Sequence, residues 1–398
     1  MDLLSKISDR IQMNHKVFFL SIICLSVNIV TYSQSLSPTF TDVDYVGNNN
    51  VKQKMDIYIP EGLTSPAPVI VFIHGGGWSE GSKGSENIPF FQQSYNSGFI
   101  CADINYRLST DSIWPAQIED CKTAIRFLKA NAALYNLDTC NFGVIGESAG
   151  GHLASLIGTS AGVKSLEGLH LGHRNQTSRV KAVVDLYGPT DFLKEDGYYP
   201  LSCGTGYIHN FNSYETKLLG IDFLTSYPEL VGKANPITYI SGDDARFFII
   251  HGADDCVVPS YQSTLLSSAL SAARIPADNF IIAEGRGHGD PYFKTTSITT
   301  MFNDFFLTHL LTPCIISSAI RERKLRNVTV FPNPATDKIE IVLSLKDNFS
   351  VEILNIIGIT VLHVRNQNTI DISGLRRGVY FLKLSSSNES YIQKIIKD

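Results

Sequence analysis

The fold is decided by one stretch, Asn141-Phe142-Gly143-Val144-Ile145-Gly146-Glu147-Ser148-Ala149-Gly150. Its first half is apolar and predicts a buried strand, and the segment after it, 151–159, has the pattern of a helix. Ser148 is therefore expected at a sharp strand-to-helix turn, where small neighbours avoid clashes and the hydroxyl is lifted out of the sheet. Amides at the start of the helix favour developing negative charge beside it. This context makes Ser148 a candidate nucleophile.

Short apolar runs alternate with longer helical patterns on both sides of this stretch, from about Asp42 to Leu311. Strands that alternate with helices predict a mostly parallel sheet flanked by helices on both faces, an α/β fold. The expected strands are Val69–Ile73, Phe99–Ile104, Phe142–Ile145, Val180–Leu186, Arg246–Ile250 and Phe280–Ala283, and the expected helices are Trp114–Asn131, Gly151–Thr159 and Tyr261–Arg274. An aromatic-rich insertion at about 192–240 is expected to cover the site as a lid.

The C-terminal part of the chain has a different pattern. Its β runs are short, are separated by Gly, Asn and Ser turns, and show no helical periodicity, which predicts a small all-β sandwich at 328–398. These runs are Ile339–Leu345, Ser350–Leu354, Thr360–Val364, Gly378–Leu384 and Tyr391–Ile396. Residues 312–327, with Pro313 and a basic cluster, are the expected linker between an α/β domain at 42–311 and this sandwich.

The N-terminus reads as an export signal over residues 1–33. Lys6, Arg10 and Lys16 precede the apolar run Val17–Val30, which is shorter than the ~20 residues that a permanent membrane span needs. Small residues before Gln34 suit cleavage there. The six cysteines left after cleavage could form disulfides, and their scattered positions without a C-x-x-C spacing argue against a zinc or dithiol site.

Composition excludes several classes of protein. With 43% hydrophobic residues the chain can build a large core, so it is not mainly disordered. The net charge of −5 without a long run of one sign argues against a nucleic-acid partner.

A serine nucleophile needs a base, and the base needs a carboxylate that orients it. Downstream, the strand Phe280–Ala283 leads into a glycine-flanked histidine, His288, and the strand Arg246–Ile250 leads into Asp254 and Asp255. Neighbours in an extended segment point in opposite directions, so only one of these aspartates can face His288. The order serine, acid, histidine is that of an α/β-hydrolase triad.

Upstream, the sequence His74-Gly75-Gly76-Gly77-Trp78 ends the strand Val69–Ile73. Consecutive glycines let backbone N–H groups approach an oxyanion without a side chain in the way. Together with the amide of Ala149 they would form an oxyanion hole.

These motifs, in this order, resemble the α/β-hydrolase esterases of the hormone-sensitive-lipase and BD-FAE-like kind, over roughly 42–311. The motifs are His74–Trp78, Trp114–Asp120, Gly146–Gly150, Tyr187–Asp191, His251–Pro259 and Gly287–Gly289. The resemblance implies Ser148 as nucleophile, His288 as base and, from the spacing His-Gly-x-x-Asp-x-x-Val-Pro, Asp255 as acid. It also implies Gly76, Gly77 and Ala149 as oxyanion donors, a structural role for His74, and no cofactor or metal.

The tail resembles the C-terminal sorting domain of the type IX secretion system. The likeness rests on Val330–Ala335, Val351–Asn355 followed by Gly358, and Leu375 with Gly378–Leu382. It implies that the type IX machinery is a partner and that the protein reaches the cell surface or the medium. A carbohydrate-binding sandwich is the alternative, although the tail has few aromatic residues for a sugar platform.

The sequence therefore predicts a secreted serine carboxylic-ester hydrolase without a permanent membrane span. Its substrates are expected among small-molecule or polysaccharide esters, such as acetyl or feruloyl esters of plant polysaccharides. A serine peptidase of the same fold and a non-catalytic adhesion protein remain as alternatives.

Overall fold

The computed structural model describes residues 36–84, 88–204, 210–311, 328–342, 349–355, 360–385 and 390–398. The expected signal segment at 1–33 and the expected linker at 312–327 lie outside the described residues.

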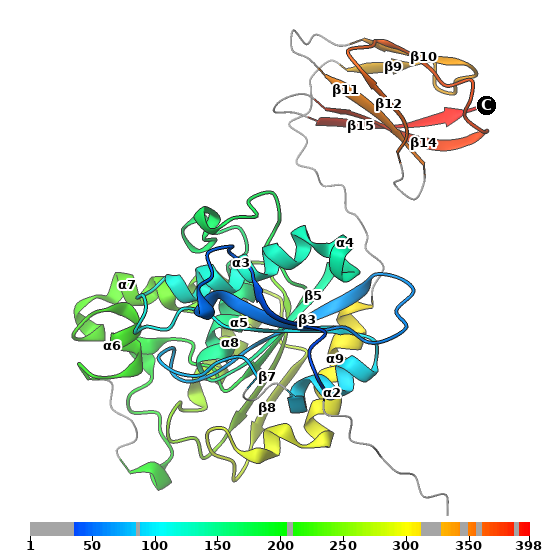
Figure 1. Ribbon diagram of the computed structural model, residues 1–398. Helices are drawn as coiled ribbons and strands as arrows, with labels where there is room; N and C mark the ends of the chain where they lie inside the picture. Colours follow the sequence, from blue (N-terminus) through cyan, green and yellow to red (C-terminus); the bar gives the residue numbers. More distant parts are fainter. Residues whose placement is uncertain are drawn as a thin grey trace, which may run out of the picture.

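One eight-stranded sheet forms the centre of the larger domain, in the order β1-β2-β4-β3-β5-β6-β7-β8 (Figure 1). Its strands are β1 Phe40–Asp44, β2 Lys54–Tyr58, β3 Ala67–Ile73, β4 Ile100–Ile104, β5 Leu137–Glu147, β6 Ala182–Leu186, β7 Arg246–Gly252 and β8 Asn279–Ala283. The first two strands pair antiparallel, and all pairs from β4 to β8 are parallel. The carboxyl ends of the parallel strands therefore meet at one edge, where open α/β sheets bind ligands.

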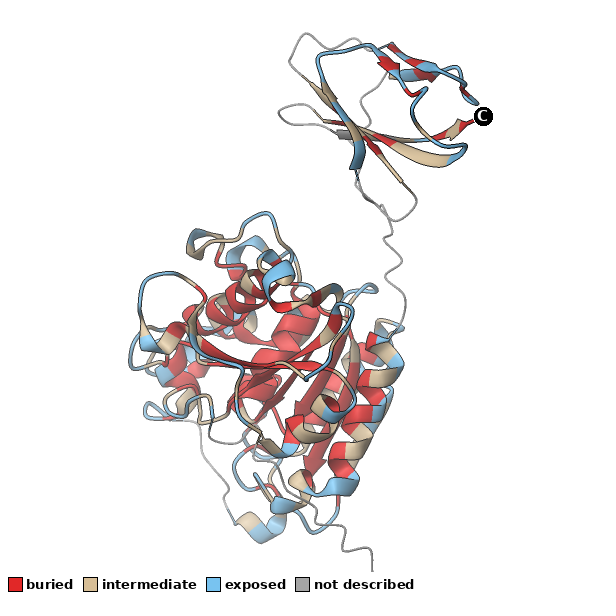
Figure 2. Cartoon of the chain, turned by 45° about the vertical axis from the view of Figure 1, so that its right-hand side comes forward, coloured by how far each residue is buried: buried red, intermediate tan, exposed pale blue. Residues whose placement is uncertain are grey.

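Helices cover both faces of this sheet. Successive side chains of a strand point to opposite faces, and here the side chains on both faces are apolar and need to be covered. Along β3, Val69, Val71 and Ile73 pack in one hydrophobic cluster, and Ile70 and Phe72 pack in the other. The first cluster includes α3 (Ala116–Ala130), α5 (Ala149–Thr159) and α8 (Tyr261–Ala272), and the second includes α2 (Ile88–Asn96) and α9 (Thr296–Leu310). Figure 2 shows the buried sheet between these two layers. Shorter helices are α4 (Ala132–Tyr135), α6 (Tyr214–Leu219) and α7 (Pro228–Ala234).

The predicted α/β-hydrolase fold is confirmed, with differences in extent. β5 begins at Leu137, well before the predicted Phe142, since the polar residues between them conceal the start of the strand. β1, β2, α2 and α9 had no counterpart in the prediction. α9 is rich in threonine, so its apolar stripe of Ile298, Phe302, Phe305 and Phe306 is hard to recognise.

The predicted C-terminal β domain is also confirmed, as two antiparallel sheets with a core of their own. The sheets have the orders β13-β10-β9 and β12-β11-β14-β15. Their strands are β9 Thr329–Phe331, β10 Lys338–Val342, β11 Ser350–Leu354, β12 Thr360–Arg365, β13 Thr369–Asp371, β14 Gly378–Ser385 and β15 Ser390–Lys397. Alternate residues such as Ile339, Ile341, Val351 and Ile353 are buried between the sheets. This alternation is typical of a sandwich.

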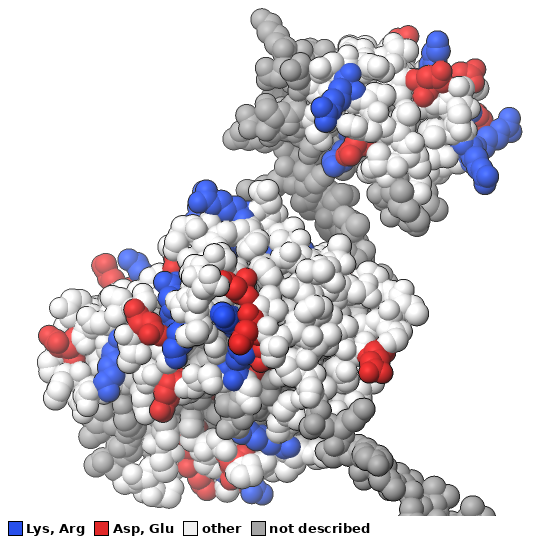
Figure 3. Space-filling model, viewed as in Figure 1, with Lys and Arg blue, Asp and Glu red and all other residues white. Residues whose placement is uncertain are grey.

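One face of the protein carries charges of both signs (Figure 3). On the face shown in Figure 3, acidic and basic side chains of the described residues are interspersed. Such a face lacks the broad basic patch that a nucleic-acid backbone requires. In the described ranges, no helix has the length and apolar content to cross a bilayer.

The contact between α9 and β5 can be tested at Gly143. A Cβ atom at this position would lie 2.7 Å from Cε1 of Phe306 and 2.9 Å from Cδ1 of Leu310. Because the core is close-packed, we expect Gly143→Val to lower the free energy of unfolding by about 1–3 kcal/mol. Unfolding in guanidinium followed by tryptophan fluorescence measures this, since Trp78 and Trp114 are both buried in the larger domain.

Gly232 in α7 is the matched control, since a Cβ atom there would meet nothing within 4 Å. Gly232→Ala should leave stability unchanged or raise it by up to about 1 kcal/mol. Equal effects of the two substitutions would contradict the close contact at Gly143.

Candidate functional site

Ser148 lies between β5 and α5, with backbone angles φ 54° and ψ −122°. Non-glycine residues rarely adopt such angles, and in native structures this strain clusters at functional sites. A Cβ atom at Gly146 would lie 2.1 Å from the carbonyl oxygen of Gly150, and one at Gly150 would lie 2.0 Å from that of Ile73. Only glycine fits at both positions, so the pentapeptide is required by the turn itself.

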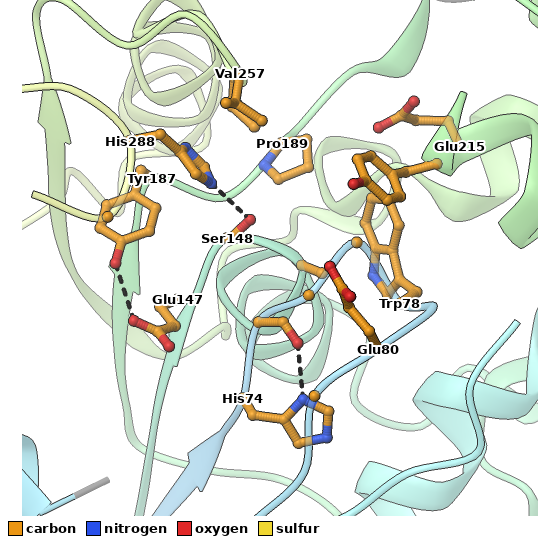
Figure 4. A pocket seen from close by; sticks show the side chains of 18 of the residues that line it. His74, Trp78, Glu80, Glu147, Ser148, Tyr187, Pro189, Glu215, Val257 and His288 are labelled. Atoms are coloured by element: carbon orange, nitrogen blue, oxygen red, sulfur yellow. Dashed lines mark hydrogen bonds between the residues drawn. The ribbon is translucent and has the colours of Figure 1, made fainter. Parts of the chain in front are cut away.

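His288 follows β8 and contacts both other members of the expected triad. Its Nε2 atom lies 2.9 Å from Ser148 Oγ (Figure 4), and its Nδ1 atom lies 2.7 Å from Asp255 Oδ2. A carboxylate only accepts hydrogen bonds, so Nδ1–H donates to Asp255 and Nε2 is left to accept from the serine hydroxyl. The structure thus brings together Ser148, Asp255 and His288 from the carboxyl ends of β5, β7 and β8, three parallel strands of the same sheet.

Asp255 is completely buried, whereas Asp254 is exposed. The Oδ1 atom of Asp255 accepts hydrogen bonds from the backbone amides of Val257 and Val258, at 2.8 and 2.9 Å. Burial alone raises the pKa of Asp255, but hydrogen bonds from His251 and His288 outweigh it and hold this pKa well below its ordinary value. The carboxylate is therefore charged at neutral pH and faces His288.

Sequence reasoning gave no role to His251, which contacts the same carboxylate. Its Nε2 lies 3.2 Å from Asp255 Oδ2 and 2.9 Å from the carbonyl oxygen of Val258, and its Nδ1 lies 2.7 Å from Ser263 Oγ. The side chain is fully buried and holds the acid loop from behind. The only signal in the sequence was its place at the start of the motif that ends at Pro259.

Tyr187 and Glu147 form a second pair that sequence reasoning missed. The Tyr187 hydroxyl donates to Glu147 Oε2 at 3.0 Å, and the tyrosine ring lies 4.9 Å from the ring of His288 (Figure 4). Burial raises the pKa of Glu147. Tyr187 packs against the histidine ring, and the only signals in the sequence were the places of Glu147 and Tyr187 in the motifs Gly146–Gly150 and Tyr187–Asp191.

The glycines after β3 line the same cavity as Ser148 and Ala149. Gly76 and Gly77 have φ values of 102° and 53°. A Cβ atom on Gly76 would lie 2.3 Å from the carbonyl oxygen of Glu80, and one on Gly77 would lie 2.3 Å from the Tyr214 ring. A side chain at Gly76 or Gly77 is therefore excluded where the loop after β3 lines the cavity with Ser148.

His74 takes no part in these contacts. Its Nδ1–H donates to the carbonyl oxygen of Gly75 at 2.7 Å, and its ring stacks on Tyr106 with centroids 4.3 Å apart. Burial lowers the pKa of His74 to about 4, so the ring is neutral and supports the glycine loop.

The cavity above Ser148 has a volume of about 500 Å³, within the range of small-molecule sites. His288 lies on one side of Ser148, and Trp78 and Glu215 lie on the other (Figure 4). Tyr214 and Glu215 come from the insertion, which therefore contributes to the wall. Among the described residues, no group of three or more His, Cys, Asp and Glu side chains is placed to hold a metal ion.

The insertion is tied to the loop that carries Asp255. Cys203 forms a disulfide with Cys256, with Cα atoms 5.4 Å apart. In addition, the Tyr199 hydroxyl donates to the carbonyl oxygen of Val257 at 3.3 Å, and the ring of Tyr198 stacks on that of Tyr261. The sequence left the pairing of the cysteines open. The structure joins Cys203 to Cys256, next to Asp255, and leaves Cys101 and Cys121 as buried free thiols.

Comparison with known proteins places these features in a family. The BD-FAE family model matches residues 55–270, and the model of the secretion system C-terminal sorting domain matches residues 329–398. Esterase LipC of Mycobacterium tuberculosis is 31% identical over 60% of this chain and 57% of its own length. Probable carboxylic ester hydrolase LipM of the same organism is 33% identical over 50% of this chain and 44% of its own. The chain spans about half the length of these curated relatives.

Solved structures agree on the fold. A truncated carbohydrate esterase from gut microbiota is 32% identical, with a TM-score of 0.63 over 68% of this chain and 95% of its own. A bifunctional GH43-CE protein of Bacteroides eggerthii is 36% identical, with a TM-score of 0.61 over 68% of this chain and 35% of its own. With a family match over more than half of its residues, the chain belongs to the BD-FAE family, a hormone-sensitive-lipase-like family of esterases, and ends in a secretion system C-terminal sorting domain.

Proposed function

We propose that the protein is an exported serine esterase in which Ser148, His288 and Asp255 form the catalytic triad. The observation that carries the proposal is the pair of hydrogen-bond distances at His288, 2.9 Å to Ser148 Oγ and 2.7 Å to Asp255 Oδ2. This chain of contacts can remove the serine proton and stabilise the imidazolium that results. The family and the esterases among its relatives support ester hydrolysis.

The reaction begins when Ser148 Oγ attacks the ester carbonyl carbon while its proton moves to His288 Nε2. The carbonyl oxygen becomes an oxyanion, and the amides of Gly76, Gly77 and Ala149 donate to it. His288 then gives its proton to the alkoxy oxygen, so that the alcohol leaves and an acyl-serine remains. Water attacks this ester by the same steps, which releases the carboxylic acid and restores Ser148. Asp255 stays ionised and keeps Nδ1 protonated throughout.

We further propose that the substrates are acyl esters of carbohydrates, such as acetyl or feruloyl esters of plant polysaccharides. Support comes from the carbohydrate esterase of gut microbiota, which is 32% identical, and from the sorting domain, which implies delivery by the type IX machinery to the cell surface or medium. An extracellular enzyme meets polymers that cannot enter the cell. No observation favours the peptidase or adhesion alternatives.

Replacement of the nucleophile tests the proposal. Ser148→Ala should keep the fold and lower kcat for p-nitrophenyl acetate by about 10⁴-fold or more, because no acyl-enzyme can form. Assays of methyl ferulate and of an aminoacyl-p-nitroanilide on the same sample separate esterase from peptidase. His288→Ala should lose a similar amount, and the double variant little more, since triad members act as a unit. Turnover near that of the wild type would refute the proposal.

A second test distinguishes the two adjacent aspartates. Asp255→Asn should lose at least about a hundredfold in kcat, since its buried carboxylate holds the histidine tautomer. Asp254→Asn should lose less than about tenfold, because the side chain of Asp254 is exposed. The backbone N–H of Asp254 donates to Arg286 O, and the substitution keeps this bond. Both variants are first compared with the wild type by circular dichroism. The reverse order would assign the acid to Asp254.

Removal of the tail separates catalysis from export. Deletion of residues 327–398 should leave ester hydrolysis unchanged, because the residues assigned to catalysis all precede 312 and the tail has its own core. In the native host the shortened protein should accumulate in the periplasm, as measured by immunoblotting of cell fractions. Equal arrival of both forms at the cell surface or in the medium would contradict the sorting role, and loss of polysaccharide binding would favour the carbohydrate-binding alternative.

A further inference from the structure

A second cavity shares one lining residue with the cavity above Ser148. Its volume is about 460 Å³, and it lies between α2 and the beginning of α9, two helices that pack together (Figure 1). Lys294, the last residue of the 3-10 helix Pro291–Lys294, lines both cavities, so the two lie close together. The other lining residues are Pro89, Gln92, Gln93, Asn96, Ser97, Thr296 and Thr299.

The lining of this second cavity is made largely of amide and hydroxyl groups, with Lys294 as its cationic member. Gln93 is held in place, since its Nε2 donates to Thr296 O at 3.2 Å and its Oε1 accepts from Thr300 Oγ1 at 2.9 Å. Gln92 Nε2 donates to Asn96 Oδ1 at 3.1 Å. This bond uses one donor position of Gln92 and one acceptor position of Asn96, and a side-chain amide has two of each. Such groups match sugar hydroxyls, which also both donate and accept.

The chemistry of the proposed triad places the alcohol part of an ester on the side of Ser148 where His288 and Lys294 line the first cavity. His288 must protonate the leaving oxygen, so the alcohol has to lie on the histidine side of Ser148. From His288 a short series of ring contacts leads to the segment that carries Lys294: Tyr187 lies 4.9 Å from His288 and 4.9 Å from Phe293. On the opposite side of Ser148, the wall at Trp78 and Glu215 remains for the acyl group.

We propose that the cavity between α2 and α9 is a subsite for a neutral sugar unit of an oligomeric or polymeric alcohol, next to the unit that carries the ester. Gln92 and Asn96 bind hydroxyl groups of this unit, and Lys294 lies at the junction between the two sugars. The inference rests on the proposed hydrolysis of carbohydrate esters and adds the place in the fold where the sugar unit next to the esterified one is bound.

The test compares three substrates that differ only beyond the scissile bond: p-nitrophenyl acetate, acetylated xylose and acetylated xylotetraose. The double variant Gln92→Ala/Asn96→Ala removes the two amides without touching the triad or the oxyanion loop. We expect kcat/KM for acetylated xylotetraose to fall about tenfold through a higher KM, because two hydrogen bonds to substrate are lost. Values for the two smaller substrates should stay within about twofold of the wild type.

Asn175→Ala is the matched control, because Asn175 is an exposed amide in the segment between α5 and β6 and lines neither cavity. It should leave all three substrates unchanged. An equal loss on all three substrates by the double variant, or no loss on the xylotetraose ester, would overturn the subsite. A wild-type enzyme without preference for the tetraose over the xylose ester would do the same. Wild-type inactivity on p-nitrophenyl acetate would instead refute the esterase proposal itself.

Discussion

The left-handed backbone at Ser148 is the constraint on which the rest of the site depends. At φ 54° the chain leaves β5 and enters α5 within one residue. This is possible only because Gly146 and Gly150 have no Cβ atom: at Gly146 it would collide with the carbonyl oxygen of Gly150, and at Gly150 with that of Ile73. The turn lifts the hydroxyl above the edge of the sheet at which β3, β7 and β8 also end and the loops after them begin. Since parallel strands place all their carboxyl ends at one edge, groups far apart in the chain meet there.

Electrostatics at this edge are arranged around one buried charge. Asp255 loses all contact with water, and two backbone amides and two histidines replace its hydration. A carboxylate held in this way stays ionised and cannot rotate, which keeps the His288 ring in one orientation and one tautomer. Tyr187 packs against the same ring, so the proposed base is constrained by packing as well as by hydrogen bonds.

The insertion and the acid loop form one unit. The Cys203–Cys256 bridge begins at the residue after Asp255, and Tyr199 bonds to the next residue along. Tyr214 of the same insertion lies against Gly77 on the other wall of the cavity. The segment that shapes the cavity is thereby attached to the loop that carries the proposed catalytic acid, as suits an exported enzyme in a compartment where disulfides persist.

Much of this protein could be predicted from its sequence, since local patterns determine local structure. The apolar runs that alternate with helical patterns, the glycine-flanked Ser148 and the order of the motifs were enough for the fold and for the proposed nucleophile and base. The motif spacing already favoured Asp255 over Asp254, and the tertiary structure added that Asp255 is buried and faces His288 while Asp254 is exposed, because their orientation depends on the path of the loop around His288. Only the tertiary structure decided the place of His251 beside Asp255, the Cys203–Cys256 pairing, and the cavity between α2 and α9. Each of these joins segments that sequence periodicity cannot relate, since they meet only after the sheet has set the order of its strands.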